Sequence, residues 1–233
     1  LYAVLVRPPA LSSKVARAFD VPVQALWPRE GDTTHDFYRP AVSHRLRGTL
    51  DGRGAVAAWE HRVVGPSIVE HVATSWARSL LPDCWPAFAK SFAGSMIPAF
   101  QLDQTSVEGA IDNPYGIPHL RVEYTKHEPH VPIGFWRSVG HSHAAFAVES
   151  FVDELAHRAG KDPYAFRRAL LAARPRHLRV LDLAASKAGW GSPLPAGRGR
   201  GLAVHASFDS YCAQVAEVSV EAGAVRVHRV VTA

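Results

Sequence analysis

The sequence is poor in the features that define several protein classes. Its 233 residues include only two cysteines, Cys84 and Cys212, which lie far apart and form no CxxC pair. A disulfide scaffold, a zinc ribbon and a self-contained iron–sulfur site are therefore not expected. No run of about 18 apolar residues occurs, so we expect no membrane span. With 47% hydrophobic residues, the chain can still form a substantial core.

Familiar catalytic motifs are also missing. The sequence contains no GxSxG, P-loop, HExxH or dinucleotide-binding GxGxxG pattern. The net charge is +5 and the isoelectric point about 9.5, but the basic residues are spread along the chain. A nucleic-acid-binding face usually concentrates them among aromatic residues, so we expect a solvated basic surface and no nucleic-acid partner.

Both ends of the chain are apolar. Residues 1–7 and 225–233 each have the composition of a strand. A domain seldom begins and ends inside such strands, because each leaves an unpaired edge that attracts other chains. Two explanations stand: trimmed tails, or a fragment of a longer polypeptide. The apolar ends also favour a covering partner or a homo-oligomer.

A β-hairpin is the clearest feature of the first half. Residues 44–50 and 55–64 flank Asp51-Gly52-Arg53-Gly54, whose composition is typical of a tight turn. The second arm alternates imperfectly, with one face that carries Ala57, Trp59, His61 and Val63 and another that carries Val56, Ala58, Glu60, Arg62 and Val64.

The rest of the first half is predicted to contain short strands and long loops. Strands are expected at residues 21–26 and 119–127. Residues 29–39 have the composition of a polar, solvated loop that carries Glu30, Asp32 and Asp36. Residues 82–119 are rich in proline, glycine and aromatic residues without periodicity, which predicts an unusually long loop.

The second half is predicted to begin with three helices. An apolar stripe at helical spacing runs from Ala145 to Ala159 and is closed by Gly160. Asp162 and Pro163 form a cap and first turn for a second helix. A third helix is expected over about residues 178–188, with Gly189 as its stop.

Strands are predicted to follow these helices. Residues 191–201 have the composition of a linker, and strands over 211–220 and 225–232 turn at Glu221-Ala222-Gly223. Strands, then helices, then strands indicate an α+β fold.

The segment from Pro132 to His143 is the richest in chemistry. It leads from a strand into the helix expected near Ala144, with Ser142 as its N-cap. Free N–H groups and the helix dipole favour an anion there, and the planar fork of Arg137 suits a phosphate or a pterin oxygen. The alternative is structural: Arg137 pairs with a carboxylate and Trp136 packs in the core.

Histidines suggest a second kind of site. His141 and His143 share a face only on a strand and diverge at a helix start. A small zinc hydrolase that uses His141, His143 and His205 is one rival reading, and His127 and His130 form a looser cluster. With 13 histidines, chance pairs are common, so no metal ligand is assigned.

Several segments resemble one enzyme family. Residues 135–140 (FWRSVG), 146–156 and 160–163 resemble the large, molybdopterin-binding subunit of the xanthine dehydrogenase/aldehyde oxidoreductase family. The branch that they resemble best is the isoquinoline 1-oxidoreductase beta subunit. Further segments agree in the same order, so the resemblance covers about residues 21–233: residues 26–32, 35–40, 112–115 and 204–208.

The resemblance implies a fold, a cofactor and a reaction. It implies a partial molybdenum-cofactor-binding domain of the molybdenum hydroxylase type, with mixed or antiparallel sheet and packed helices. The cofactor would be molybdopterin cytosine dinucleotide, contacted by Trp136, Arg137, Ser138 and Gly140, with Val139 in the wall of the substrate pocket. The complete enzyme would oxidise an N-heterocycle or an aldehyde with water as oxygen source, and pass electrons to a small iron–sulfur subunit.

The chain also departs from that family. Residues 1–20 resemble a strand from an earlier part of such subunits, and residues 21–233 a later, partial molybdopterin-binding domain. The family's glycine-rich segment with the catalytic glutamate has no match, so no catalytic residue is assigned, and Glu149 is expected to cap or pair. The isolated chain is therefore expected to be inactive. The alternative is a truncated, non-catalytic relative that acts as an interaction module.

Overall fold

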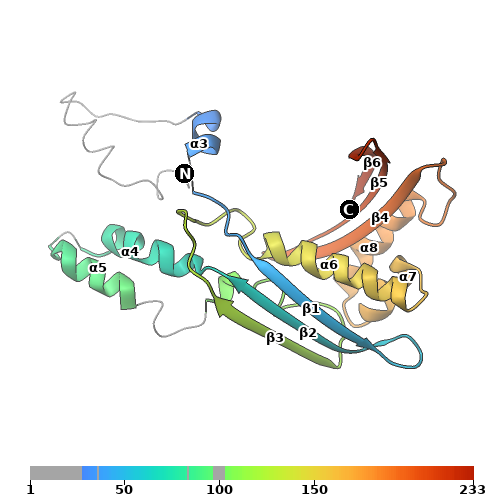
Figure 1. The fold of residues 1–233 in the computed structure, drawn as a ribbon, viewed down its shortest axis with the longest axis horizontal. Coiled ribbons are helices and arrows are strands. Elements are labelled where there is room, and N and C mark those ends of the chain that lie inside the picture. Colours follow the sequence, from blue (N-terminus) through green and yellow to red (C-terminus); the bar gives the residue numbers. More distant parts are fainter. Residues whose placement is uncertain (1–27, 36, 83, 97–102) are drawn as a thin grey trace. The chain divides into compact units, whose positions relative to one another are not determined.

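The structure of the chain is a computed structural model that describes residues 28–35, 37–82, 84–96 and 103–233 (Figure 1). It divides into two compact units. The first combines residues 1–41, 65–106 and 126–137, and the second combines residues 42–64, 107–125 and 138–233. The strands predicted for residues 1–7 and 21–26, and the segment 1–20, lie outside the described residues.

The described part of the first unit is mainly helical. It holds α3 (Arg29–His35), α4 (Ile68–Leu80), α5 (Ala87–Met96) and the 3-10 turn η2 (Gln104–Ser106). Ser67 caps α4, because its hydroxyl oxygen accepts from the Glu70 N–H at 3.2 Å. The Asp103 carboxylate closes the same helix end, since it accepts from the Ser67 hydroxyl at 2.7 Å and the Val69 N–H at 3.2 Å.

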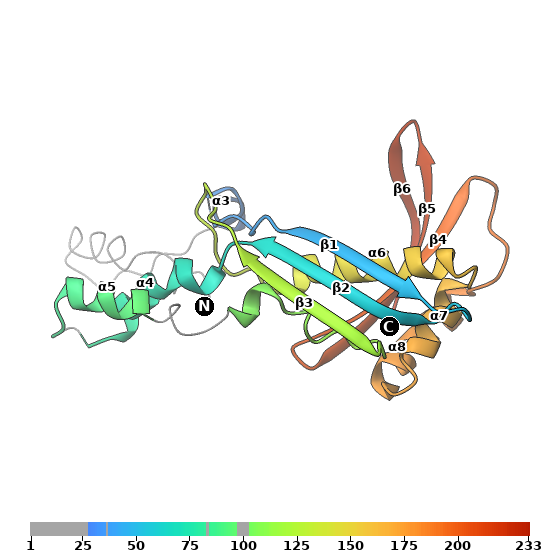
Figure 2. The ribbon, with the colours of Figure 1, turned by 60° about the horizontal axis from the view of Figure 1, so that its bottom comes forward.

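The second unit begins with a sheet in the order β1-β2-β3, formed by β1 (Ser43–Leu50), β2 (Val56–Gly65) and β3 (His119–Lys126) (Figure 2). The predicted hairpin is confirmed, and the Asp51 carboxylate holds its turn by accepting two backbone N–H groups at 2.8 Å. Trp59, His61 and Val63, which the sequence places on one face of β2, are all buried, whereas Glu60 and Arg62 of the other face are exposed.

Three helices follow, and the first of them packs against β1 of this sheet. They are α6 (His141–Arg158), α7 (Pro163–Leu170) and α8 (Pro175–Ala188). Gly48 of β1 lets α6 approach, since an added Cβ would lie 2.9 Å from Leu155. Asp162 caps α7 by accepting from the Ala165 N–H at 2.9 Å, and Gly189 ends α8 in the left-handed conformation, both as predicted.

The second sheet is antiparallel in the order β4-β5-β6, with β4 (Arg198–Ser207), β5 (Ser210–Glu221) and β6 (Ala224–Thr232). Helix α8 packs on β4 and β5. Apolar side chains from these elements and α6 form one core that includes Val152, Leu181, Val204 and Val215. The α+β fold class is confirmed.

A buried ion pair ties α6 to α7 within this core. The Arg167 guanidinium is fully buried, and its Nε donates to Glu149 Oε2 at 3.0 Å. The same carboxylate accepts from the Tyr115 hydroxyl at 2.6 Å and from the Val204 N–H of β4 at 2.9 Å. Glu149 therefore pairs, as predicted, and joins four segments of the unit.

Four sequence predictions were wrong. Residues 29–35 form a helix in place of a polar loop, helped by Thr33 and Thr34 hydroxyls that donate to carbonyls one turn back. The long loop over 82–119 contains α5 and η2, and α4 was not predicted. The linker over 191–201 ends early, because β4 begins at Arg198. Helix α8 begins at Pro175, three residues before the expected start.

Within the described residues, no helix has the length and apolar character needed to cross a bilayer.

Candidate functional site

The loop that leads to α6 is anchored at its start within the first unit. Tyr38 and Ile133 form an isolated parallel bridge, in which the Tyr38 N–H donates to the Pro132 carbonyl at 3.0 Å. Gly134 lies against Phe37 so closely that an added Cβ would come within 2.9 Å of the Phe37 Cβ. A glycine is therefore required where the loop leaves this bridge.

Trp136 and Arg137 follow, also in the first unit, and both are exposed. Trp136 is 46% exposed, its Nε1 donates to the Phe37 carbonyl at 3.3 Å, and the Arg39 guanidinium lies 4.5 Å from its ring centre. Arg137 makes no side-chain hydrogen bond or ion pair with any residue that the structure describes. The structural alternative, a core tryptophan and a paired arginine, is not what the described residues show.

The second unit contributes the end of the loop. Residues 137–140 form a turn in which Val139 has a φ of +46°, a conformation that costs a β-branched residue free energy. The hydroxyls of Ser138 and Ser142 form a hydrogen bond with each other. Gly140 is buried directly before the helix.

The predicted helix start was wrong by nearly one turn. Helix α6 begins at His141, Gly140 is its N-cap, and no side chain caps it. Ser142 lies inside the first turn, where its N–H donates to the Val139 carbonyl at 3.3 Å and its hydroxyl is directed to Ser138. The uncapped start keeps the positive end of an 18-residue helix next to the loop.

His141 and His143 diverge, as expected at a helix start. His141 Nδ1 lies 3.0 Å from His205 Nε2, and its Nε2 lies 3.9 Å from Glu108 and 4.0 Å from Asp112. Gly109 makes room for this pair, since an added Cβ would lie 3.3 Å from His141 Nδ1. Burial, followed by the neighbouring His141, lowers the pKa of His205.

His143 belongs to a different histidine cluster, the His61–His44–His143 chain. His44 Nδ1 lies 2.8 Å from His61 Nε2, and His44 Nε2 lies 3.0 Å from His143 Nδ1. Burial, together with the charges of His44 and His143, lowers the pKa of His61 to about 4. Each of the two nitrogens of His44 contacts a different histidine, and the three described side chains do not form a metal-binding group.

The zinc reading was therefore wrong in its ligand set. His141 and His205 meet, but His143 contacts a separate pair, and His127 and His130 are exposed. Across the described ranges, no three His, Cys, Asp or Glu side chains are placed to hold a metal ion. Sequence reasoning missed His44 and the Glu108–Asp112 carboxylates. For His61, the only signal in the sequence was its place on one face of the predicted strand, together with Trp59 and Val63.

The first unit thus carries an exposed indole and a guanidinium that has no partner among the described residues, and the second unit, a few residues further along the chain, carries an uncapped helix start. Such groups suit a flat, anionic ligand with phosphate or pterin oxygens. The residues present fit a molybdopterin in that respect.

Comparisons with known proteins point the same way. Residues 94–171 match the family model of the molybdopterin cofactor-binding domain, and this range includes the whole loop and α6. The chain is 28% identical, over 89% of its length, to the beta subunit of isoquinoline 1-oxidoreductase from Brevundimonas diminuta. It is 29% identical, over 93% of its length, to the B subunit of nicotinate dehydrogenase from Pseudomonas putida.

The chain spans 24% and 18% of these two relatives, respectively. Among solved structures, quinoline 2-oxidoreductase from Pseudomonas putida 86 has a similar fold, with a TM-score of 0.52 and 17% identity. That match covers 83% of this chain and 25% of the other. The resemblance drawn from the sequence is confirmed, and the fold is a molybdopterin-binding domain fold of the molybdenum hydroxylases.

Proposed function

We propose that this relative of the molybdopterin-binding subunits supplies one part of the cofactor site of a molybdenum hydroxylase. The complete subunit would oxidise an N-heterocycle or an aldehyde with water as the oxygen source. Support comes from the matching family model and from relatives whose names refer to isoquinoline and nicotinate oxidation. The chain spans about a quarter or less of those relatives, and we propose that the activity of the complete subunit also depends on residues outside it.

The observation that carries the proposal is the exposed side chain of Arg137, which has no hydrogen bond or ion pair with the described residues and precedes the uncapped start of α6 by four residues in the sequence. A guanidinium without a protein partner can donate two parallel hydrogen bonds to a phosphate or a pterin oxygen. Trp136 offers a half-exposed flat ring, and the buried Gly140 allows close backbone approach. Ser138 and Val139 complete the loop, and we propose that Val139, whose φ is +46°, lines the substrate pocket.

The bound cofactor would supply the two-electron oxidation, and this chain would bind and orient it. We propose the cytosine dinucleotide form, whose second phosphate gives Arg137 a further acceptor. Both relatives are named as single subunits of larger enzymes, and we propose a small iron–sulfur subunit as the electron-accepting partner. With only two cysteines, this chain cannot hold such clusters itself.

Cofactor content tests the proposal. The chain is purified from a host that makes the cofactor, and pterin and molybdenum are measured per folded molecule. We expect substoichiometric cofactor in the wild type and about tenfold less in Arg137→Ala, since each lost charge-assisted hydrogen bond weakens binding by roughly 1.5–3 kcal/mol before solvent screening. Arg137→Lys keeps the charge but loses the planar fork, so it should bind intermediately.

Arg121→Ala is the matched control, because Arg121 is an exposed arginine on β3, outside the loop. It should leave the cofactor content unchanged. Wild-type cofactor content in Arg137→Ala would refute the role of the loop. A folded wild-type chain without any pterin would favour the non-catalytic interaction module.

A further inference from the structure

Two neighbouring cross-strand rows of the second sheet each have an arginine on both outer strands, β4 and β6. In the first row, Arg200 of β4 faces Glu217 of β5, which faces Arg229 of β6. The Arg200 guanidinium donates to Glu217 Oε1 at 2.9 Å, and Arg229 Nη1 lies 3.7 Å from the same oxygen. One carboxylate thus bridges two arginines.

The second row also has an arginine on each outer strand, but its central residue is of a different type. Arg198 of β4 faces Ser219 of β5, which faces Arg226 of β6. Ser219 stands where the first row has Glu217, so no carboxylate of the row bridges Arg198 and Arg226. The Ser219 hydroxyl instead donates to Glu221 Oε1 at 2.9 Å and accepts from His228 Nε2 at 2.8 Å.

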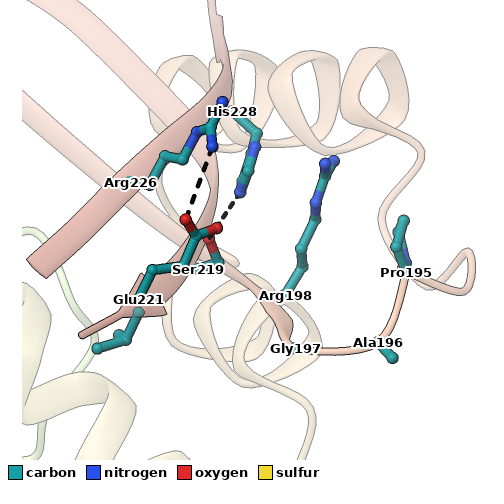
Figure 3. Close-up of a pocket in the computed structure, with 9 residues that line it drawn as sticks. Pro195, Ala196, Gly197, Arg198, Ser219, Glu221, Arg226 and His228 are labelled. Carbon is teal, nitrogen blue, oxygen red and sulfur yellow. Dashed lines mark hydrogen bonds and ion pairs between the residues drawn. The ribbon is translucent and has the colours of Figure 1, made fainter. Parts of the chain in front are cut away.

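The two arginines of the second row differ in their partners. Arg226 Nη1 lies 3.6 Å from Glu221 Oε2, so this arginine is already in an exposed ion pair. The Arg198 side chain forms no hydrogen bond or ion pair with the part of the chain that the structure describes. Figure 3 shows Arg198 extended between the turn at Pro195–Gly197 on one side and Arg226, His228 and Glu221 on the other.

These residues line a pocket of about 440 Å³. It lies between the turn at Pro195–Gly197, which precedes β4, and the outer end of the β5–β6 hairpin. Pockets of roughly 300–1,000 Å³ are typical of small-molecule sites. Its lining carries two guanidiniums and one carboxylate, so the pocket attracts anions.

We propose that this pocket binds a small molecule with a carboxylate or phosphate group. The anionic group would bind Arg198 as Glu217 binds Arg200, and would lie over Ser219, with Arg226 and His228 as further donors. Bidentate guanidinium contacts recognise both kinds of oxyanion, so the arginine supplies the shared chemistry. This site consists of residues outside the loop at Arg137, so its test does not depend on whether that loop binds the cofactor.

Titration of the isotope-labelled chain tests the site. Inorganic phosphate and succinate are added separately, and the Nε–H signals of the arginine side chains are followed by NMR. We expect saturable binding in the millimolar range, with the tighter anion identifying the preferred oxyanion. Arg198→Gln should weaken that binding about fivefold, the effect of losing one partly screened charge-assisted contact.

Ser219→Glu places a carboxylate at the centre of the second row, as Glu217 is at the centre of the first. The new carboxylate should occupy the place of the anion beside Arg198 and so abolish anion binding, while the fold is kept. Arg53→Gln, at the exposed hairpin turn of the other sheet, is the control and should bind like the wild type. Equal weakening in Arg198→Gln and Arg53→Gln, an unchanged Arg198→Gln, or no saturation would each overturn the proposal.

Discussion

Replacing Arg167 with methionine should be among the most destabilising single changes in the second unit. The guanidinium is fully buried and donates to the Glu149 carboxylate at 3.0 Å and to the Glu149 carbonyl at 2.9 Å. It also donates to Asp153 and to the Pro163 carbonyl, so it connects α6 with the start of α7. Methionine fills a similar volume but leaves Glu149 buried without its cation.

Removing one partner of a buried ion pair typically costs about 3–5 kcal/mol, because the remaining charge is uncompensated. That is a large share of the roughly 5–15 kcal/mol that stabilises a domain. The adjacent Arg168 pairs with Asp182 on the surface, with half of its side chain exposed. Such pairs contribute about 0–1 kcal/mol, so Arg168→Met is a control on the same helix.

The loss should also depend on pH. Burial raises the pKa of Glu149, and Arg167 opposes that rise. Without Arg167 the pKa rises further above its unfolded value, so Glu149 is tolerated when protonated and is unfavourable when ionised. Stability is then kept below the unfolded pKa and lost as the pH rises, so the deficit should be larger at about pH 7 than at about pH 5.

Guanidinium chloride unfolding of both variants at these two pH values measures the effect. Glu149→Gln in the Arg167→Met background should restore part of the stability, because it removes the unpaired charge. If Arg167→Met and Arg168→Met are equally stable, or if the Arg167→Met deficit is independent of pH, the buried network does not act as described.

Three further changes test other parts of the fold. Lowering the pH from about 6.5 to about 4 should reduce the free energy of unfolding by up to roughly 3 kcal/mol, because His61 binds a proton in the unfolded chain but not when it is buried in the folded chain. His61→Leu should flatten that pH dependence in acid titrations of unfolding. Gly109→Ala should destabilise the fold, since the φ of Gly109 is +82° and an added Cβ would lie 2.8 Å from the Ala144 Cβ. Gly52→Ala, with open space around the added Cβ, should leave the stability unchanged, and thermal unfolding of the two variants tests the difference. Asp162→Ala should cost about 1 kcal/mol through the lost cap of α7, and an equally stable variant would remove that role.

Local signals in the sequence predicted much of the second unit. The hairpin turn at Asp51–Gly54, the cap at Asp162 and the stop at Gly189 each depend on residues a few positions apart, and all were confirmed. The helix at α4 was missed although Ser67 and Glu70 form the S-x-x-E pattern that precedes helices. At β4, glycines that suggested a linker are strand residues, because pairing with β5 decides their conformation.

Partners that are distant in sequence could not be predicted. His141 and His205 meet across 64 residues, and Glu149 receives a backbone N–H from Val204, 55 residues away. The bridge between Arg200 and Glu217 depends on the strand register, which the alternation of side chains alone does not fix. The resemblance to a known family singled out the loop at residues 136–140. That Arg137 has no side-chain partner among the described residues could be seen only in the structure.

Anaerobic titration of the purified chain with molybdopterin cytosine dinucleotide, released from a holoenzyme, measures whether the loop at Trp136 and Arg137 binds the cofactor. Tryptophan fluorescence reports binding, and Trp136→Phe identifies the contribution of the loop, since Trp136 is half exposed beside Arg137. We expect saturable quenching in the wild type that Trp136→Phe largely removes and that requires about tenfold more cofactor in Arg137→Ala. Identical titration curves for the wild type and Arg137→Ala would contradict this expectation.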